Sequence, residues 1–214
     1  MIVLRRFFCE DRGASAAEFA LVLPLLLLFL LGTIDAGRFA WEFNRAEKAT
    51  QTGARWAVVT DAIEPGLYAW NAVGTTVNGV TLTQGDVVPA GALGLVTCEV
   101  PANGTTVACT CSNTTGLCSY TPGTPNQTAW NAMVGRMQQI WPQIQSSDVV
   151  LEYRGSGLGF AGDPNGMDVS PLVTVRLKDM EFFPLSLFLF TGNLSLPDFS
   201  YTLPMEDGSG TRSN

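Results

Sequence analysis

Four clustered cysteines carry the most obvious chemistry in this sequence. Cys98, Cys109, Cys111 and Cys118 lie in a stretch rich in Gly, Thr and Asn, whereas Cys9 stands apart near the start. An even, clustered set of this kind favours two disulfides, with three possible pairings, and disulfides indicate an oxidising compartment. A zinc ion held by the four thiolates is the competing interpretation, but the spacing lacks paired C-x2-C motifs. We therefore expect this part of the chain to lie outside the cytoplasm.

The sequence contains no histidine, and this excludes several kinds of catalytic and metal site. Metal centres built on His, Ser-His-Asp triads and Cys-His pairs all need an imidazole. No pair of carboxylates, lysine nucleophile or hydroxyl with an adjacent base stands out, so we expect neither an enzyme nor a cofactor. The formal net charge is −7 and the basic residues are dispersed, which argues against nucleic acid as a partner.

Two weaker motifs lie close together late in the chain. The segment GLGFAG, residues 157–162, matches G-x-G-x-x-G, but DPNG follows where a dinucleotide site requires a helix. Asp163, Asn165 and Asp168 have side chains that can ligate calcium, yet the loop lacks the EF-hand spacing and its distal Glu. We interpret both motifs as turns.

Glu18 is chemically conspicuous because it stands at the start of a long apolar run. Sixteen uncharged residues separate it from Asp35. Crossing the hydrocarbon takes about 20 apolar residues, so the pattern predicts a transmembrane helix over about residues 19–38, with both carboxylates near the interfaces or paired. A cleaved secretory signal is the alternative, but acidic residues precede the run and the run is long.

The helical pattern continues beyond the membrane. Apolar or small residues recur at spacings of three and four from Phe39 to Trp56. We expect one helix from Ala14 to about Val59, roughly 70 Å long, so that half of it lies along a soluble domain or neighbouring subunits. Basic residues flank both sides of the span and do not decide its orientation, whereas the clustered cysteines place the C-terminal part outside.

The segment from Arg12 to Val59, RGASAAEFALVLPLLLLFLLGTIDAGRFAWEFNRAEKATQTGARWAVV, resembles the N-terminal region of TadE-like proteins. These are minor pilins, or pseudopilins, of bacterial tight-adherence (Flp) pilus systems and are relatives of type IV pilins. In that family a short basic leader ends in Gly, a prepilin peptidase cuts after it on the cytoplasmic side, and Glu followed by an aromatic residue begins at the fifth mature position. The matching residues are Gly13, Ala14, Glu18 and Phe19.

The resemblance implies a leader over residues 1–13 and a mature protein that begins at Ala14. The leader is less basic than is usual in the family, because it contains Glu10 and Asp11. Cleavage creates a positive α-amino group about one helical turn from Glu18, and in pilins this carboxylate is thought to pair with such an amine. The alternative is that Glu18 lies in the headgroup layer and simply ends the span.

The resemblance also implies partners and a location. The expected partners are the prepilin peptidase, other pilin subunits, the pilus assembly platform and the inner membrane. The implied topology is a single pass with a periplasmic C-terminal domain, and incorporation into an extracellular pilus is left open. An uncleaved single-pass anchor with an exported partner-binding domain is the alternative function. A secreted module that begins near Gly37 is a third.

Residues 60–206 are expected to form an exported α+β domain with an antiparallel sheet and one further helix. Asn78-Gly79 predicts a β-hairpin, and residues 96–125 are expected to be a disulfide-rich loop. An amphipathic helix is predicted from about Thr128 and is disturbed near Pro142. Strands are predicted within residues 148–155, 170–179 and 197–206, and the tail 207–214 is expected to be disordered.

Overall fold

The computed structural model describes residues 11–119, 121–164, 166–186, 192 and 194–206, with side chains of the first helix described from Ser15 onward. Most of the leader, Cys9, Asn165 and the tail 207–214 therefore lie outside the described residues. The chain divides into two compact units. The first unit comprises Met1–Phe43 and Glu181–Ser195, and the second comprises Asn44–Met180 and Leu196–Asn214. Each is described separately below.

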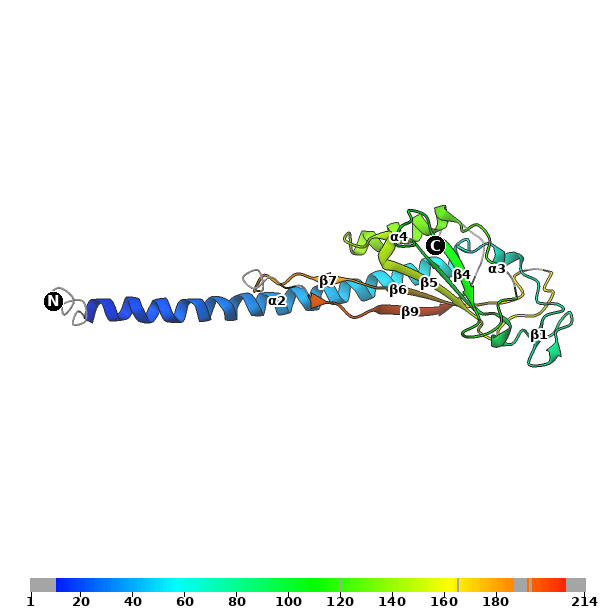
Figure 1. The fold of residues 1–214 in the computed structure, drawn as a ribbon, viewed down its shortest axis with the longest axis horizontal. Coiled ribbons are helices and arrows are strands. Elements are labelled where there is room, and N and C mark those ends of the chain that lie inside the picture. The colour runs from blue at the N-terminus through cyan, green and yellow to red at the C-terminus, as the bar shows by residue number, and fades with distance from the viewer. Residues whose placement is uncertain (1–10, 120, 165, 187–191, 193, 207–214) are drawn as a thin grey trace. The chain divides into compact units, whose positions relative to one another are not determined.

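The helix α2 runs without interruption through 49 residues, Asp11–Val59, and contributes to both units (Figure 1). Its end at Val59 is the predicted one, but it begins at Asp11, inside the expected leader, and not at Ala14. Ala and Leu, the strongest helix formers, dominate the apolar run and favour this conformation. Pro24 lies within the helix and removes one backbone N–H from its hydrogen-bond ladder.

The second unit is built on a five-stranded antiparallel sheet with the order β4-β3-β5-β6-β9. Figure 1 shows β5, β6 and β9 side by side. The strands β3 and β6 alternate between buried and partly exposed positions, and the sheet and a further helix confirm the predicted α+β class. The strands are β3 (Leu95–Glu99), β4 (Ala108–Ser112), β5 (Val149–Arg154), β6 (Leu172–Leu177) and β9 (Phe199–Pro204).

Two helices pack within the core of the second unit. These are α4 (Gln127–Ile140), which Asn126 caps by accepting a hydrogen bond from the Ala129 N–H, and the part of α2 after Phe43. A Cβ placed on Gly53 of α2 would lie 2.7 Å from the Met137 sulfur of α4 and 3.4 Å from a methyl group of Val175 in β6. The glycine therefore permits close approach of the helix backbone to its neighbours.

The expectation of a disulfide-rich loop over residues 96–125 is wrong for its first part, which forms most of β3 and all of β4. Val96 and Cys98 alternate with less buried residues and face the core, as strand geometry requires. The surrounding Gly, Thr and Asn residues obscured this period in the sequence. Cys98 lies directly opposite Cys109 in the β3–β4 register, so the cysteines belong to the sheet and its margin.

Short elements complete the second unit. The predicted hairpin is present, with Asn78 and Gly79 at φ angles of 52° and 82°, as a two-residue turn of type I′ requires. The remaining elements are β1 (Thr76–Val77), β2 (Val80–Thr81), α3 (Gly66–Ala69), and the 3-10 turns η1 (Ala90–Ala92) and η2 (Ser146–Asp148).

The first unit combines the apolar part of α2 with a small hairpin of two strands. These are β7 (Glu181–Phe182) and β8 (Leu194–Ser195), which pair antiparallel. Phe182 is buried, and its ring meets that of Phe39 edge to face at a centroid distance of 5.5 Å. This aromatic pair packs the hairpin against α2.

Candidate assembly and membrane-anchoring site

The N-terminal part of α2 exposes a long, almost uninterrupted apolar surface. The helix is long and apolar enough to cross a membrane, and no residue of its most apolar 18-residue window is buried within the chain. Large side chains on every side of the helix are exposed, Leu21 at 79% and Phe29 at 75% among them. A surface of this kind is stable in contact with lipid or with other apolar helices, and it fits a single-pass membrane anchor.

The four residues predicted for processing and assembly lie in the first three turns of α2. Gly13 and Ala14 are within the helical backbone, and Glu18 follows Ala14 by four positions, about one turn. Glu18 is exposed and Phe19 is 65% exposed. Among the residues that the structure describes, no ion pair reaches Glu18. The carboxylate is therefore sterically accessible to an amine at residue 14 or to another subunit.

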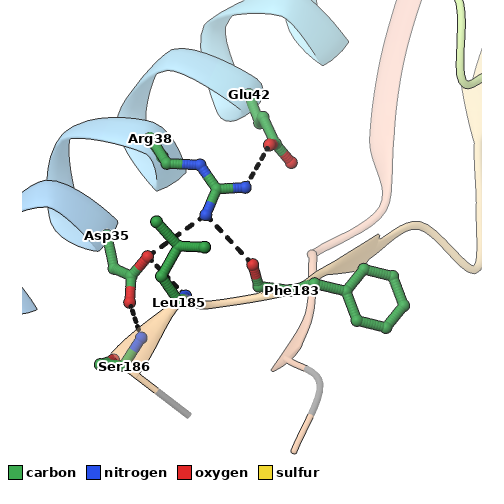
Figure 2. A network of polar contacts seen from close by, with 6 residues as sticks. All are labelled: Asp35, Arg38, Glu42, Phe183, Leu185 and Ser186. Carbon is green, nitrogen blue, oxygen red and sulfur yellow. Dashed lines mark hydrogen bonds and ion pairs between the residues drawn. The ribbon is translucent and has the colours of Figure 1, made fainter. Parts of the chain in front are cut away.

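A polar network in the first unit lies where the apolar run ends, and Figure 2 shows it in close view. Asp35 is almost fully buried, and its two oxygens accept hydrogen bonds from backbone N–H groups of the segment after β7. Oδ1 accepts from Leu185 at 2.8 Å, and Oδ2 accepts from Ser186 at 2.6 Å. One carboxylate of α2 thus holds two successive backbone donors of a distant segment.

Arg38, one turn further along α2, completes this network. Its Nη1 lies 3.3 Å from Asp35 Oδ1 and donates to the Phe183 carbonyl oxygen at 3.3 Å, while Nη2 lies 3.7 Å from Glu42 Oε1. The guanidinium carbon is also 5.3 Å from the centroid of the Phe182 ring, a cation–π distance. We call Asp35, Arg38 and the backbone groups of residues 183, 185 and 186 the Asp35 clasp.

Sequence reasoning did not find this clasp. The sequence pattern placed Asp35 near the membrane interface or in a pair, without indicating a partner. The available signal was the spacing of Asp35 and Arg38, an acidic and a basic residue three positions apart at the end of an apolar run. Their backbone partners could not be identified, because they lie about 150 positions away and carry no distinctive side chains.

The four clustered cysteines form two disulfides, Cys98–Cys109 and Cys111–Cys118. This selects one of the three possible pairings and occupies all four sulfurs, so the zinc interpretation is not supported. The first disulfide joins adjacent strands, and the second closes the turn after β4, where Asn113 Oδ1 accepts from the Cys118 N–H. Both are covalent ties within the second unit.

The motifs near residue 160 form turns held by one carboxylate. Asp168 is buried, and its oxygens accept from the backbone N–H groups of Ala72, Gly162 and Asp163 at 2.7, 2.8 and 3.0 Å. Residues 163, 164 and 166–171 contain no helix, so the dinucleotide fingerprint lacks its required context. The described residues contain no cluster of three or more His, Cys, Asp or Glu placed to hold a metal ion.

An open hollow of about 520 Å³ lies in the second unit beside the hairpin β1–β2 and the second disulfide. The residues that line it are uncharged and offer hydroxyl, amide and apolar groups, but no nucleophile with a base. They are Val73, Gly74, Thr75, Thr76, Asn113, Leu117, Cys118 and Ser119.

Most of α2 matches the model of a known protein family. Residues 13–55 match the family model described as TadE-like protein. The N-terminal segment is TadE-like. The match confirms the resemblance drawn from the sequence. No curated protein matches the chain, and no solved structure matches it.

The TadE-like segment contains most of the residues singled out above. It begins at Gly13, continues through Glu18 and Phe19, and includes both side chains of the Asp35 clasp. It ends within α2, four positions before the helix ends at Val59. The sheet of the second unit and the backbone partners of Asp35 lie beyond the matched region.

Proposed function

We propose that this protein is a minor pilin of a bacterial tight-adherence (Flp-type) pilus. The observation that carries the proposal is a coincidence of two findings in one segment. The TadE-like match covers residues 13–55, and the most apolar part of the helix in that segment has no residue buried within the chain. Such a helix suits storage in the inner membrane followed by packing against equivalent helices of other subunits, where the same side chains remain out of water.

Processing by a prepilin peptidase, between Gly13 and Ala14, is the first step of this proposal. The family match begins at Gly13, which supports the assignment of the leader to residues 1–13. The bond lies in the first turn of α2, where backbone N–H groups have no intrahelical partner. Opening that turn for a protease therefore costs little compared with opening the middle of the helix.

Pairing of Glu18 with the new α-amino group is the second step. Residues four positions apart in a helix face one another, so Ala14 and Glu18 of one subunit lie within reach. In an apolar environment the attraction between such charges is stronger than in water, and an unpaired carboxylate is unfavourable there. A pair formed between neighbouring subunits would set their axial register, with Phe19 packing beside it.

The second unit faces the periplasm in this proposal. Its two disulfides form in an oxidising compartment and are rare in bacterial cytoplasm. The assembly platform and its ATPase would extract the processed subunit from the membrane. The partners are thus the peptidase, other pilin subunits, the platform and the inner membrane, and no enzymatic role, cofactor or nucleic acid is part of the proposal.

Variants of Glu18 test the assembly role. We expect Glu18→Ala and Glu18→Gln to leave leader removal largely intact, measured by the size of the protein on immunoblots, and to reduce the amount of sheared pili. Glu47→Ala is the matched control, because Glu47 is an exposed carboxylate on the same helix and outside the apolar run. Normal pili from both Glu18 variants would show that Glu18 does not set the axial register of the subunits.

A further inference from the structure

We propose that the segment 183–186, held by the Asp35 clasp, is a second membrane contact of this protein. It would lie in the membrane interface, beside the point where α2 leaves the hydrocarbon. We call this segment the foot. The inference rests on insertion of α2 in a membrane and does not depend on pilus assembly.

The length of the apolar run places the clasp at the depth of the interface. The run from Phe19 to Ile34 contains sixteen residues, or roughly 24 Å of helix, against a hydrocarbon thickness of about 30 Å. The run is therefore too short to carry the next residues clear of the membrane. Asp35 follows it immediately, and Trp41, which is 67% exposed, follows within two further turns. Exposed tryptophan is typical of the interface.

The clasp satisfies the groups that are costly at this depth. A carboxylate or a backbone N–H without a hydrogen-bond partner is strongly unfavourable in a weakly hydrated environment. Asp35 accepts from the Leu185 and Ser186 N–H groups, and Arg38 lies against both Asp35 and the Phe183 carbonyl oxygen. The backbone groups of the foot and the charged side chains of α2 therefore satisfy each other's hydrogen bonds without water.

The side chains of the foot present an apolar surface next to a cation. Phe183 is 63% exposed and Leu185 is 48% exposed. Figure 2 shows the Phe183 ring directed away from α2. The Arg38 side chain is 37% exposed, so its guanidinium is accessible beside these apolar groups. Apolar side chains next to an arginine match the boundary between acyl chains and lipid phosphates.

Lipid is the occupant that these observations favour. The foot is fixed within the first unit to α2 at the end of its apolar run, so the surface of the foot continues the surface that lipid would cover. Two exposed apolar side chains are also too small an area for a stable protein interface, which needs about 800 Å² on each partner. A neighbouring copy of the chain is the competing occupant, and the experiment below separates the two.

Photocrosslinking to lipid tests the foot directly. The full chain is placed in nanodiscs of phosphatidylethanolamine and phosphatidylglycerol, with p-benzoylphenylalanine at position 183 or, as a positive control for insertion, at position 19. Both positions hold exposed phenylalanines, so the probe fits without repacking. After irradiation, the intact mass reports lipid adducts. We expect adducts at both positions.

A matched pair of variants tests whether Asp35 holds the foot. Asp35→Asn weakens the acceptor of two backbone N–H groups, and Asp86→Asn does the same to a carboxylate that accepts from the N–H and hydroxyl of Thr83 in the second unit. We expect Asp35→Asn to reduce the lipid adduct at position 183 several-fold, and Asp86→Asn to leave it unchanged. An adduct that is insensitive to Asp35→Asn would overturn the role of the clasp.

The remaining outcomes overturn different parts of the inference. A lipid adduct at position 19 but none at position 183, or a crosslink from position 183 to a second copy of the chain, would overturn the foot and leave the anchor in place. The absence of a lipid adduct at position 19 would overturn membrane insertion, and the foot with it.

Discussion

Asp35 and Ser186 are 151 positions apart in the sequence, yet the Asp35 Oδ2 atom accepts a hydrogen bond from the Ser186 N–H at 2.6 Å. Together with the bond from Leu185, this gives a carboxylate at the end of the apolar helix two backbone donors. Hydrogen bonds to a charged acceptor are stronger than neutral ones, and a buried carboxylate without them is unfavourable. Asp35 therefore ties the foot to α2, in addition to the contacts that Arg38 and Phe39 make with Phe182 and Phe183.

Asp35→Ala should release the foot. Without the carboxylate, the N–H groups of Leu185 and Ser186 lose their acceptor, so we expect their hydrogen exchange to accelerate at least tenfold. Hydrogen–deuterium exchange of the protein in nanodiscs measures this. Exchange in β5 and β6 of the second unit serves as the internal control. Unchanged protection of residues 185 and 186 would contradict the clasp.

Gly53→Leu should destabilise the second unit, because the new side chain would meet the Met137 sulfur and a Val175 methyl group. Overpacking of this kind costs about 1–3 kcal/mol. The matched control is Gly135→Leu on α4, where a Cβ meets nothing within 4 Å and helix propensity improves. Urea unfolding, followed by tryptophan fluorescence in detergent, compares the two. Equal stabilities of the two variants would show that Gly53 is not closely packed.

The disulfide between β3 and β4 should contribute measurably to the stability of the second unit. Cys98 is fully buried and opposite Cys109, with a sequence separation of 11 residues. We expect the double variant Cys98→Ala and Cys109→Ala to lose about 2–4 kcal/mol of unfolding free energy. The double variant Cys111→Ala and Cys118→Ala, which opens a shorter and more exposed loop, should lose less. A larger loss from the second pair would reverse this ranking.

Tyr153 should make the second unit sensitive to alkaline pH. Burial raises the pKa of its hydroxyl above the ordinary value, against the opposing hydrogen bond from the Ile63 N–H to the phenolic oxygen. Because the folded-state pKa exceeds the unfolded one, the neutral phenol's contribution to stability is fully present below about pH 10 and is lost as the pH rises above it. Urea unfolding between pH 8 and 11 should show this decline.

The variant Tyr153→Phe isolates that titration. It cannot ionise, so its unfolding free energy should fall less steeply above pH 10, although it is lower at neutral pH because the Ile63 N–H loses its acceptor. Parallel pH profiles for the two proteins would contradict a buried, neutral Tyr153.

The parts of the fold that were predictable from the sequence depend on local signals. The end of α2 at Val59, the turn at Asn78-Gly79 and the alternation of Val173, Val175 and Leu177 in β6 each follow from periods or turn residues within a few positions. Each concerns the conformation of one short segment, for which neighbouring residues carry the information.

The features that were missed depend on long-range pairing. The strand character of residues 95–99 becomes evident only when β5 lies beside it, because the register Cys98 to Leu151 buries both residues. Similarly, Asp35 gains its role from backbone donors of Leu185 and Ser186, which no side-chain pattern marks. The candidate processing and assembly residues were identified through a family resemblance. Gly13, Ala14 and Phe19 have no chemistry that singles them out without it, and Glu18 stands out as a carboxylate before an apolar run but gains its assembly role only from the resemblance.

The most direct test of the proposed function is the N-terminus and intact mass of the membrane-extracted protein, from cells with and without their prepilin peptidase. We predict a start at Ala14 that depends on the peptidase, with a mass lower by that of residues 1–13. A start at Met1 in both strains would contradict the pilin account and leave an uncleaved single-pass anchor, and a peptidase-independent start near Gly37 would indicate a secreted module.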